Sequence, residues 1–277
     1  MFAGASSIAL GLLLVVFLIV GFAIYTAIIW QIGARRSTAP RENFDAAKNF
    51  ELPEAILAAI LISLICTGIV VSRGQPQAPL NNPSLVRNFL LGNFLIAVVI
   101  VSIVTGFLKL RGIDLDAIAG FSKASLKRAV STGIVLLLAA TPLIMVAEVI
   151  TQSLFGGGSS RQEIVDLFNS SQTIQQRMMI IVLAVVVAPM SEEFIFRFFI
   201  YGVLRRYFGI AIGLFFNAAL FGAAHNHLPS ALPLFVLGAC FTLAYEWSGS
   251  ILVSMAMHAL FNGTQLIFLA FPNLFQQ

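Results

Sequence analysis

Long apolar stretches follow one another along almost the whole chain, and they constrain its fold more than any other feature. The first 34 residues hold no charged side chain, and the apolar segment 8–32 is long enough to cross a bilayer. A cleaved signal peptide would show a basic start and a shorter apolar core, so we predict a true first span. Seven further stretches of this kind follow, at about 52–72, 89–108, 130–150, 178–200, 209–224, 232–245 and 251–271.

The composition agrees with a chain that lies mostly inside a membrane. Only 10% of the residues are charged and 59% are hydrophobic, whereas soluble domains carry about 25% charged residues. A bilayer admits helices or closed barrels because it offers backbone groups no water. We therefore predict an all-α, polytopic transmembrane helical bundle of about eight spans. Seven spans is the main alternative, because 232–245 is short for a span. Such a protein is integral and multi-pass, and its short loops favour a prokaryotic cell membrane.

Basic side chains are distributed unevenly between the loops. Of the 16 lysines and arginines, most follow the first, third or fifth span: Arg35, Arg36, Arg41, Lys48, Lys109, Arg111, Lys123, Lys127, Arg128, Arg205 and Arg206. Basic residues collect in cytoplasmic loops, which predicts cytoplasmic odd-numbered loops and extracytoplasmic termini. This asymmetry accounts for the sequence pI near 9.4, and we expect no nucleic-acid partner.

Three ionisable side chains lie inside the apolar segment 178–200, namely Glu192, Glu193 and Arg197. Each charge at the centre of a bilayer costs about 2.5–3.5 kcal/mol on insertion scales, so such residues pair or line a polar site. Glu193 and Arg197 are four residues apart and can pair on one helix face. Glu192 lies about 100° around the helix, where it can serve as a general base that activates water. The alternative is an ion cluster that serves only folding.

Histidines add polar groups to two later spans. His225 follows Phe221 by one helical turn, and His258 precedes Asn262 by one turn. An imidazole and an amide together can donate hydrogen bonds to a developing oxyanion. Each histidine taken alone is more typical of a packing residue. Polar clusters on three late spans, with little polarity elsewhere in the membrane, favour one shared site.

Read in order, the three motifs resemble those of the CPBP family (CAAX proteases and bacteriocin-processing enzymes, also called ABI), and in particular type II CAAX prenyl endopeptidases. The motifs are Glu192-Glu193-x-x-x-Arg197, Phe221-x-x-x-His225 and His258-x-x-x-Asn262. They fall in the segment 178–271, which we predict to carry the catalytic helices. The segment 1–150 has transmembrane helices without a recognised motif, and we expect both segments to form one integrated membrane domain.

The resemblance implies an intramembrane endopeptidase that hydrolyses a peptide bond of a membrane-associated protein or peptide. In this reading Glu192 activates the attacking water with help from His225. His258 and Asn262 stabilise the oxyanion, and Glu193 and Arg197 support Glu192. A non-catalytic membrane scaffold or regulator with the same fold is the alternative, and a carrier that uses the carboxylates as proton relays is a third.

Two questions stay open at this level. The chain lacks His-Glu-x-x-His, the helical zinc-protease motif. Glu192, His225 and His258 are still candidate ligands for a zinc ion with three protein ligands. The second question is depth: a sixth span that starts beside Arg205 would place His225 far across the membrane from Glu192.

Overall fold

The computed structural model describes residues 2–38, 50–72, 83–155, 168, 171 and 173–271. Within these ranges the chain is helical and contains no β-strand, which confirms the predicted fold class. The long helices are α1 (Phe2–Thr38), α2 (Leu52–Ser72), α3 (Pro83–Leu110), α5 (Leu126–Phe155), α7 (Ile174–Val182), α9 (Tyr201–Ala224), α10 (Leu228–Ser248) and α11 (Ile251–Ala270). Between α7 and α9 the chain continues through η3 (Leu183–Val187), α8 (Ala188–Glu193) and η4 (Phe194–Ile200).

Seven of the described helices are long and apolar enough to cross a membrane, and one of them contains two of the predicted spans. This helical stretch, Ile174–Ala224, is 51 residues long. Its chain turns at Gly209, where φ is 80° and ψ is 175°, a conformation that glycine adopts without strain. The turn brings Gly213 back onto Arg205, because a Cβ at Gly213 would lie 2.9 Å from the Arg205 amide nitrogen. The stretch therefore crosses the membrane twice, which agrees with about eight spans.

The seventh span is longer than its sequence suggests. We expected 232–245, but α10 runs over Leu228–Ser248. The sequence is misleading there because Pro229 and Pro233 look like helix breakers. Pro229 occupies the first turn, where a missing N–H costs nothing. Of the described spans this helix is also the most buried, with 61% of its most apolar stretch covered by the rest of the protein. The helices α5, α9 and α11 all pack against it.

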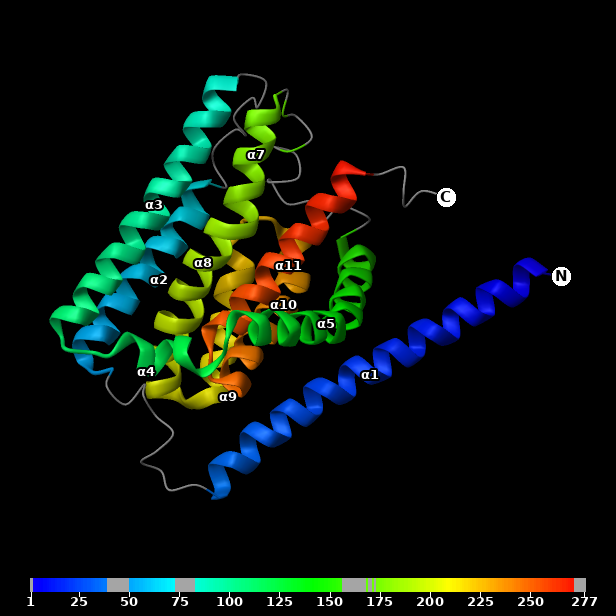
Figure 1. The fold of residues 1–277 in the computed structure, drawn as a ribbon, viewed down its shortest axis with the longest axis horizontal. Coiled ribbons are helices and arrows are strands. Elements are labelled where there is room, and N and C mark those ends of the chain that lie inside the picture. Colours follow the sequence, from blue (N-terminus) through cyan, green and yellow to red (C-terminus); the bar gives the residue numbers. More distant parts are fainter. Residues whose placement is uncertain are drawn as a thin grey trace.

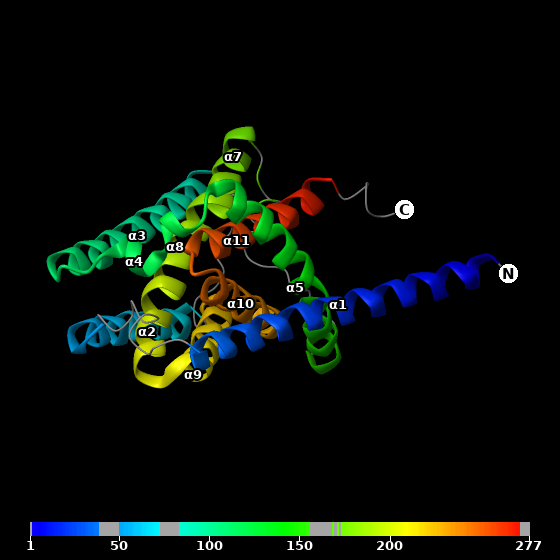
Figure 2. The same ribbon diagram turned by 60° about the horizontal axis from the view of Figure 1, so that its bottom comes forward.

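The remaining helices lie on two sides of this centre. In Figures 1 and 2, α1 lies on one side of α8 to α11 and the pair α2 and α3 lies on the other. The N-terminal half of α1 extends away from the bundle in both views. Its C-terminal half packs on α5, where the Tyr25 hydroxyl donates to the Leu136 carbonyl at 3.0 Å. Gly21 lets α1 approach the Ala139 carbonyl closely.

Loops and helix ends from distant parts of the chain meet at one end of the bundle, which we call the basic end. There the Arg35 guanidinium donates to the Trp247 carbonyl at 2.8 Å, and Arg205 pairs with Glu246 at 3.2 Å. The Tyr245 hydroxyl also donates to the Ile118 carbonyl at 2.7 Å. These contacts agree with the predicted common side of the odd-numbered loops.

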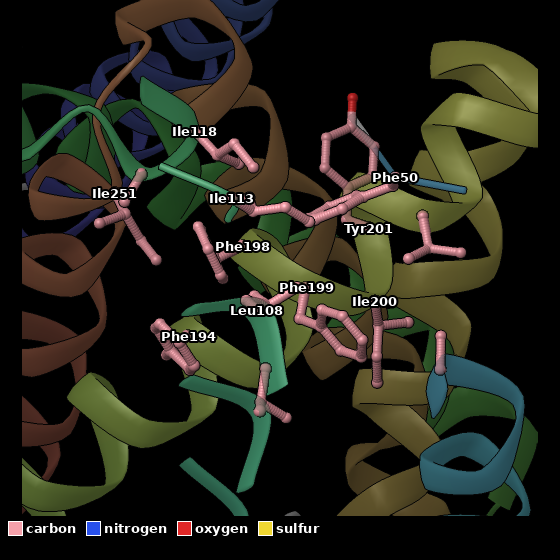
Figure 3. Close-up of a cluster of buried hydrophobic side chains, with 14 of the residues drawn as sticks. Phe50, Leu108, Ile113, Ile118, Phe194, Phe198, Phe199, Ile200, Tyr201 and Ile251 are labelled. Atoms are coloured by element: carbon pink, nitrogen blue, oxygen red, sulfur yellow. The ribbon is translucent and has the colours of Figure 1, made fainter. Parts of the chain in front are cut away.

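A large apolar cluster fixes the helix that carries the acidic motif. Figure 3 shows Phe194, Phe198 and Phe199 of η4 among side chains from other elements. Phe50, which precedes α2, is fully buried and lies edge-on to Phe199, with 5.9 Å between ring centroids. Its ring fills the space that Gly202 leaves free. The cluster thereby holds η4 in place from the side of α2 and α3.

Candidate active site

The two glutamates of the acidic motif lie on a short α-helical segment between two wider ones. They end α8, while η3 before it and η4 after it are π-helical. Such π segments inside α-helices are rare and occur often at functional sites. Pro189 contributes to this geometry, because it lacks the N–H that would continue the helical hydrogen bonds. Glu192 and Glu193 thus lie at an irregular part of a membrane-spanning helix.

Glu193 and Arg197 pair as their spacing predicted. The Arg197 Nη1 atom lies 2.9 Å from Glu193 Oε1, and both side chains are fully buried. The same oxygen lies 2.9 Å from His258 Nδ1 on α11. A carboxylate oxygen only accepts hydrogen bonds, so His258 donates through Nδ1–H. Glu193 therefore joins the fifth and the last spans.

Arg197 is enclosed by aromatic rings rather than by further charges. Its guanidinium carbon lies 4.2 Å from the Phe221 ring centroid and 5.2 Å from that of Phe241. Its Nη2 atom donates to the Gly238 carbonyl at 3.2 Å. Cation–π contacts of desolvated arginines contribute about 2 kcal/mol or more. These contacts, together with Glu193, offset the cost of a buried guanidinium.

Glu192 differs from its neighbour in exposure and in partners. Its side chain is 31% exposed, and its Oε2 atom lies 3.9 Å from His258 Nε2. This Oε2 has no hydrogen-bond partner among the described residues. Atoms at this separation can both contact a single water molecule. The adjacent glutamates are therefore one fully buried ion-pair partner and one partly exposed side chain whose Oε2 atom faces His258.

His225 and Glu192 are about equally far along the chain from the turn at Gly209, which bears on the question of depth that the sequence left open. Glu192 precedes the turn at Gly209 by 17 residues and His225 follows it by 16, which places both about 25 Å from the turn. The ring of Phe221 lies 4.8 Å from that of His225 and 5.8 Å from that of His258. The apparent mismatch arose because the sequence argument measured the depth of His225, but not that of Glu192, from the turn between the fifth and sixth spans.

His225 and Asn262 each use one polar atom on a backbone carbonyl. The Nδ1 atom of His225 lies 2.8 Å from the Phe221 carbonyl oxygen. A carbonyl only accepts, so His225 donates through Nδ1–H and keeps Nε2 free for another partner. Asn262 Nδ2 donates to the Ala184 carbonyl at 2.8 Å, which leaves its second amide hydrogen available.

The candidate zinc ligands do not fit a metal site in this arrangement. In the described part of the chain, no group of three or more histidine, cysteine, aspartate or glutamate side chains is placed to hold a metal ion. The Nδ1 hydrogen bonds of His258 and His225 leave both Nε2 atoms free, so the lack of fit rests on the placement of the side chains alone. We therefore derive no chemical step through zinc.

Several residues at the site carry no sequence motif of their own. Phe241 stacks on His258 with 5.0 Å between ring centroids, and Gly238 supplies the carbonyl that holds Arg197. Both come from α10, whose residues are mostly apolar, so no polar motif marks these two positions. The glycine at position 238 was itself a signal of close helix packing, because a Cβ there would lie 3.3 Å from Arg197 Nη2.

Comparison with known proteins bears on the segment that carries the site. Residues 174–264 match the family model described as Rce1-like, type II CAAX prenyl endopeptidase. This segment is therefore similar to the CAAX protease family. The segment includes Glu192, His225, His258 and Asn262. The family resemblance read from the three motifs is thereby confirmed.

One curated relative agrees with the family match. The membrane-embedded CAAX protease MroQ of Staphylococcus aureus is 32% identical over 88 residues, which are 30% of this chain and 36% of that protein. The chain thus matches about a third of the length of this relative. No solved structure matches the chain. With its spanning helices, the chain is a multi-pass integral membrane protein.

Proposed function

We propose that this protein is an intramembrane endopeptidase that hydrolyses a peptide bond of a membrane-associated protein or peptide. The observation that carries the proposal is the contrast between two adjacent carboxylates. Glu193 is fully buried against Arg197, whereas Glu192 is 31% exposed and faces His258. A partly exposed carboxylate beside an imidazole is suited to take a proton from water. The family match of residues 174–264 supports the same reaction class.

In the proposed reaction, Glu192 removes a proton from a water molecule, and the resulting hydroxide attacks the carbonyl carbon of the substrate. The free Nε2 atom of His225 helps to orient this water as an acceptor. The proton on Glu192 then passes to the departing nitrogen as the carbon–nitrogen bond breaks. Water supplies all the atoms that the two products gain.

Donors for the oxyanion come from the last span. Asn262 can offer its second amide hydrogen, since the first is held by Ala184. His258, when protonated at both nitrogens, donates to Glu193 through Nδ1 and to the oxyanion through Nε2. Loss of one such donor typically slows an enzyme about 10²–10³-fold. Glu193 and Arg197 act as positioning residues, because they hold the His258 ring in place.

The test compares wild type with Glu192→Gln in reconstituted membranes. Candidate substrates are peptides with and without a C-terminal lipid, because the family match does not fix the substrate of this chain. We expect Glu192→Gln to lower the cleavage rate about 10²–10⁴-fold, which is the usual contribution of a general base. Glu148→Gln is the matched control, since Glu148 lies on another spanning helix and is hydrogen bonded to Gln152.

Cleavage by Glu192→Gln at the wild-type rate would overturn the proposed catalytic role. A wild type that cleaves no peptide of a broad panel would favour the scaffold alternative. A chelator added to the wild-type reaction decides the question of zinc. We expect an unchanged rate, because no group of three such side chains in the described ranges is placed to hold a metal ion.

A further inference from the structure

Asn217 is a fully buried polar residue in the middle of the sixth span. Its Nδ2 atom donates to Thr242 Oγ1 on α10 at 3.1 Å, and its side chain has no exposed area. Its Oδ1 atom has no hydrogen-bond partner in the described ranges. A buried polar atom without a partner costs about 1–3 kcal/mol. An apolar side chain would therefore serve folding alone better than this asparagine.

A chain of hydrogen bonds leads from Asn217 to the ion pair. Thr242 Oγ1 accepts from Asn217 and donates to the Gly238 carbonyl at 2.9 Å. That same carbonyl accepts from Arg197 Nη2 at 3.2 Å. Arg197 in turn holds Glu193, which holds His258. Asn217 thus reaches the site through the Gly238 carbonyl, although it touches neither glutamate.

The sixth span makes a second contact with the same network. Asn217, Phe221 and His225 follow each other at intervals of four residues and share one helix face. The Phe221 ring lies 4.2 Å from the guanidinium carbon of Arg197 and 4.8 Å from the ring of His225. A shift of this helix along α10 would therefore move His225 relative to Arg197.

We propose that Asn217 is a positioning residue that sets the register of the sixth span on α10. Through Thr242 it fixes the half of the site that carries His225 relative to the half that carries Glu193 and His258. Buried polar pairs that set helix register are well attested in coiled coils. The catalytic part of this inference rests on the proposed function, whereas the geometric part does not.

The kinetic test uses Asn217→Leu and Thr242→Val, which keep the branched shape of each side chain and remove the hydrogen bonds. We expect kcat to fall about 10- to 100-fold, since small misplacements of catalytic groups have costs of this order. KM should stay the same because buried Asn217 cannot touch a substrate. The double variant should lose no more than either single one, because both act through one carbonyl. Additive losses would contradict a shared route.

Two other residues provide matched controls. Asn93 on α3 donates to the Phe89 carbonyl one turn earlier, and Thr141 on α5 does the same with Leu137. Asn93→Leu and Thr141→Val thus remove similar groups from membrane helices without touching the network. Both should leave kcat unchanged. If Asn217→Leu fails to fold, Thr242→Val decides the test alone.

A second readout does not depend on activity. The chain has three histidines, so their ring nitrogens can be followed by nuclear magnetic resonance after selective labelling. In Asn217→Leu the signals of His225 and His258 should shift, whereas His227, hydrogen bonded to Ser230, should not. If the wild type cleaves no peptide but Asn217→Leu still shifts these signals, the proposed protease function fails and the positioning role of Asn217 stands. Unchanged signals together with unchanged kcat would overturn the positioning itself.

Discussion

Two clusters of arginine and glutamate occupy different regions of the molecule. The inner cluster consists of Glu193 and Arg197, whose side chains have no exposed area. The outer cluster, at the basic end, consists of Glu51, Glu54 and Arg111. Their closest nitrogen–oxygen distances are the same, 2.9 Å in each cluster. The surroundings differ, because the side chain of Arg111 is 39% exposed and that of Glu51 is 67% exposed.

This difference separates a cluster that we propose supports catalysis from one that fastens helices. Arg111 joins the start of α2 to the end of α3. Water reaches Arg111 and Glu51, whereas Glu54 is buried and also accepts a hydrogen bond from the Glu51 backbone N–H at 2.7 Å. The hydrogen bond of Arg111 to Glu54 raises the pKa of the guanidinium, so Arg111 stays charged. Arg197 has rings and a backbone carbonyl around it. Equal distances therefore do not mean equal contributions, since a buried charge that loses its partner has no substitute.

Removing the inner arginine should have the largest effect. Arg197→Met leaves Glu193 buried without its counter-charge, which costs about 3–5 kcal/mol of stability. Cleavage should also be lost, because His258 loses the support of a fixed carboxylate. Equilibrium unfolding in detergent micelles measures the first effect and peptide cleavage the second. Arg206→Met, at an exposed position of α9, is the control and should change neither.

A second substitution sharpens this result. Arg197→Met combined with Glu193→Leu removes both charges, and replacing a buried pair by apolar residues is often neutral or stabilising by about 1–4 kcal/mol. The double variant should therefore regain stability yet stay inactive, since His258 Nδ1 has lost its acceptor. Regained cleavage would contradict the role assigned to Glu193.

The parts of the structure that local rules govern were predictable from the sequence. The bilayer core offers no water to backbone N–H and C=O groups, so these groups must pair within helices. The apolar stretches therefore predicted the spans. Helical spacing predicted the pair of Glu193 and Arg197. The turn at Gly209 and the role of Gly238 depend on how helices pack against each other, which no single stretch encodes. For that reason the depth of His225 stayed an open question, and the aromatic residues around Arg197 were missed.

The close fit around Gly238 allows a test of the inner cluster without removing a charge. In Gly238→Ala the new Cβ would lie 3.0 Å from a Phe221 ring carbon and 3.3 Å from Arg197 Nη2. Overpacking of this kind costs about 1–3 kcal/mol, and the displaced guanidinium should lower cleavage as well. The measurements are again unfolding in micelles and peptide cleavage.

Gly106→Ala is the matched control for this substitution. A Cβ at Gly106, on α3, would meet nothing within 4 Å. Alanine in a helix interior is favoured over glycine by about 0.5–1 kcal/mol, so the control should be slightly stabilised. If both variants behaved alike, the contact between Gly238 and Arg197 would not constrain the site.

The smallest effect is expected at the outer cluster. Arg111→Met should lower the thermal unfolding temperature less than Arg197→Met does, because water can solvate Glu51 and buried Glu54 keeps its hydrogen bond from the Glu51 backbone N–H. The difference from wild type should shrink as salt is added, since salt screens exposed charges. Cleavage should continue at the wild-type rate. A loss of cleavage in Arg111→Met would mean that the outer cluster also controls the site. The route would then run from α2 through Phe50, whose ring packs on Phe198 and Phe199 of η4, next to the acidic motif.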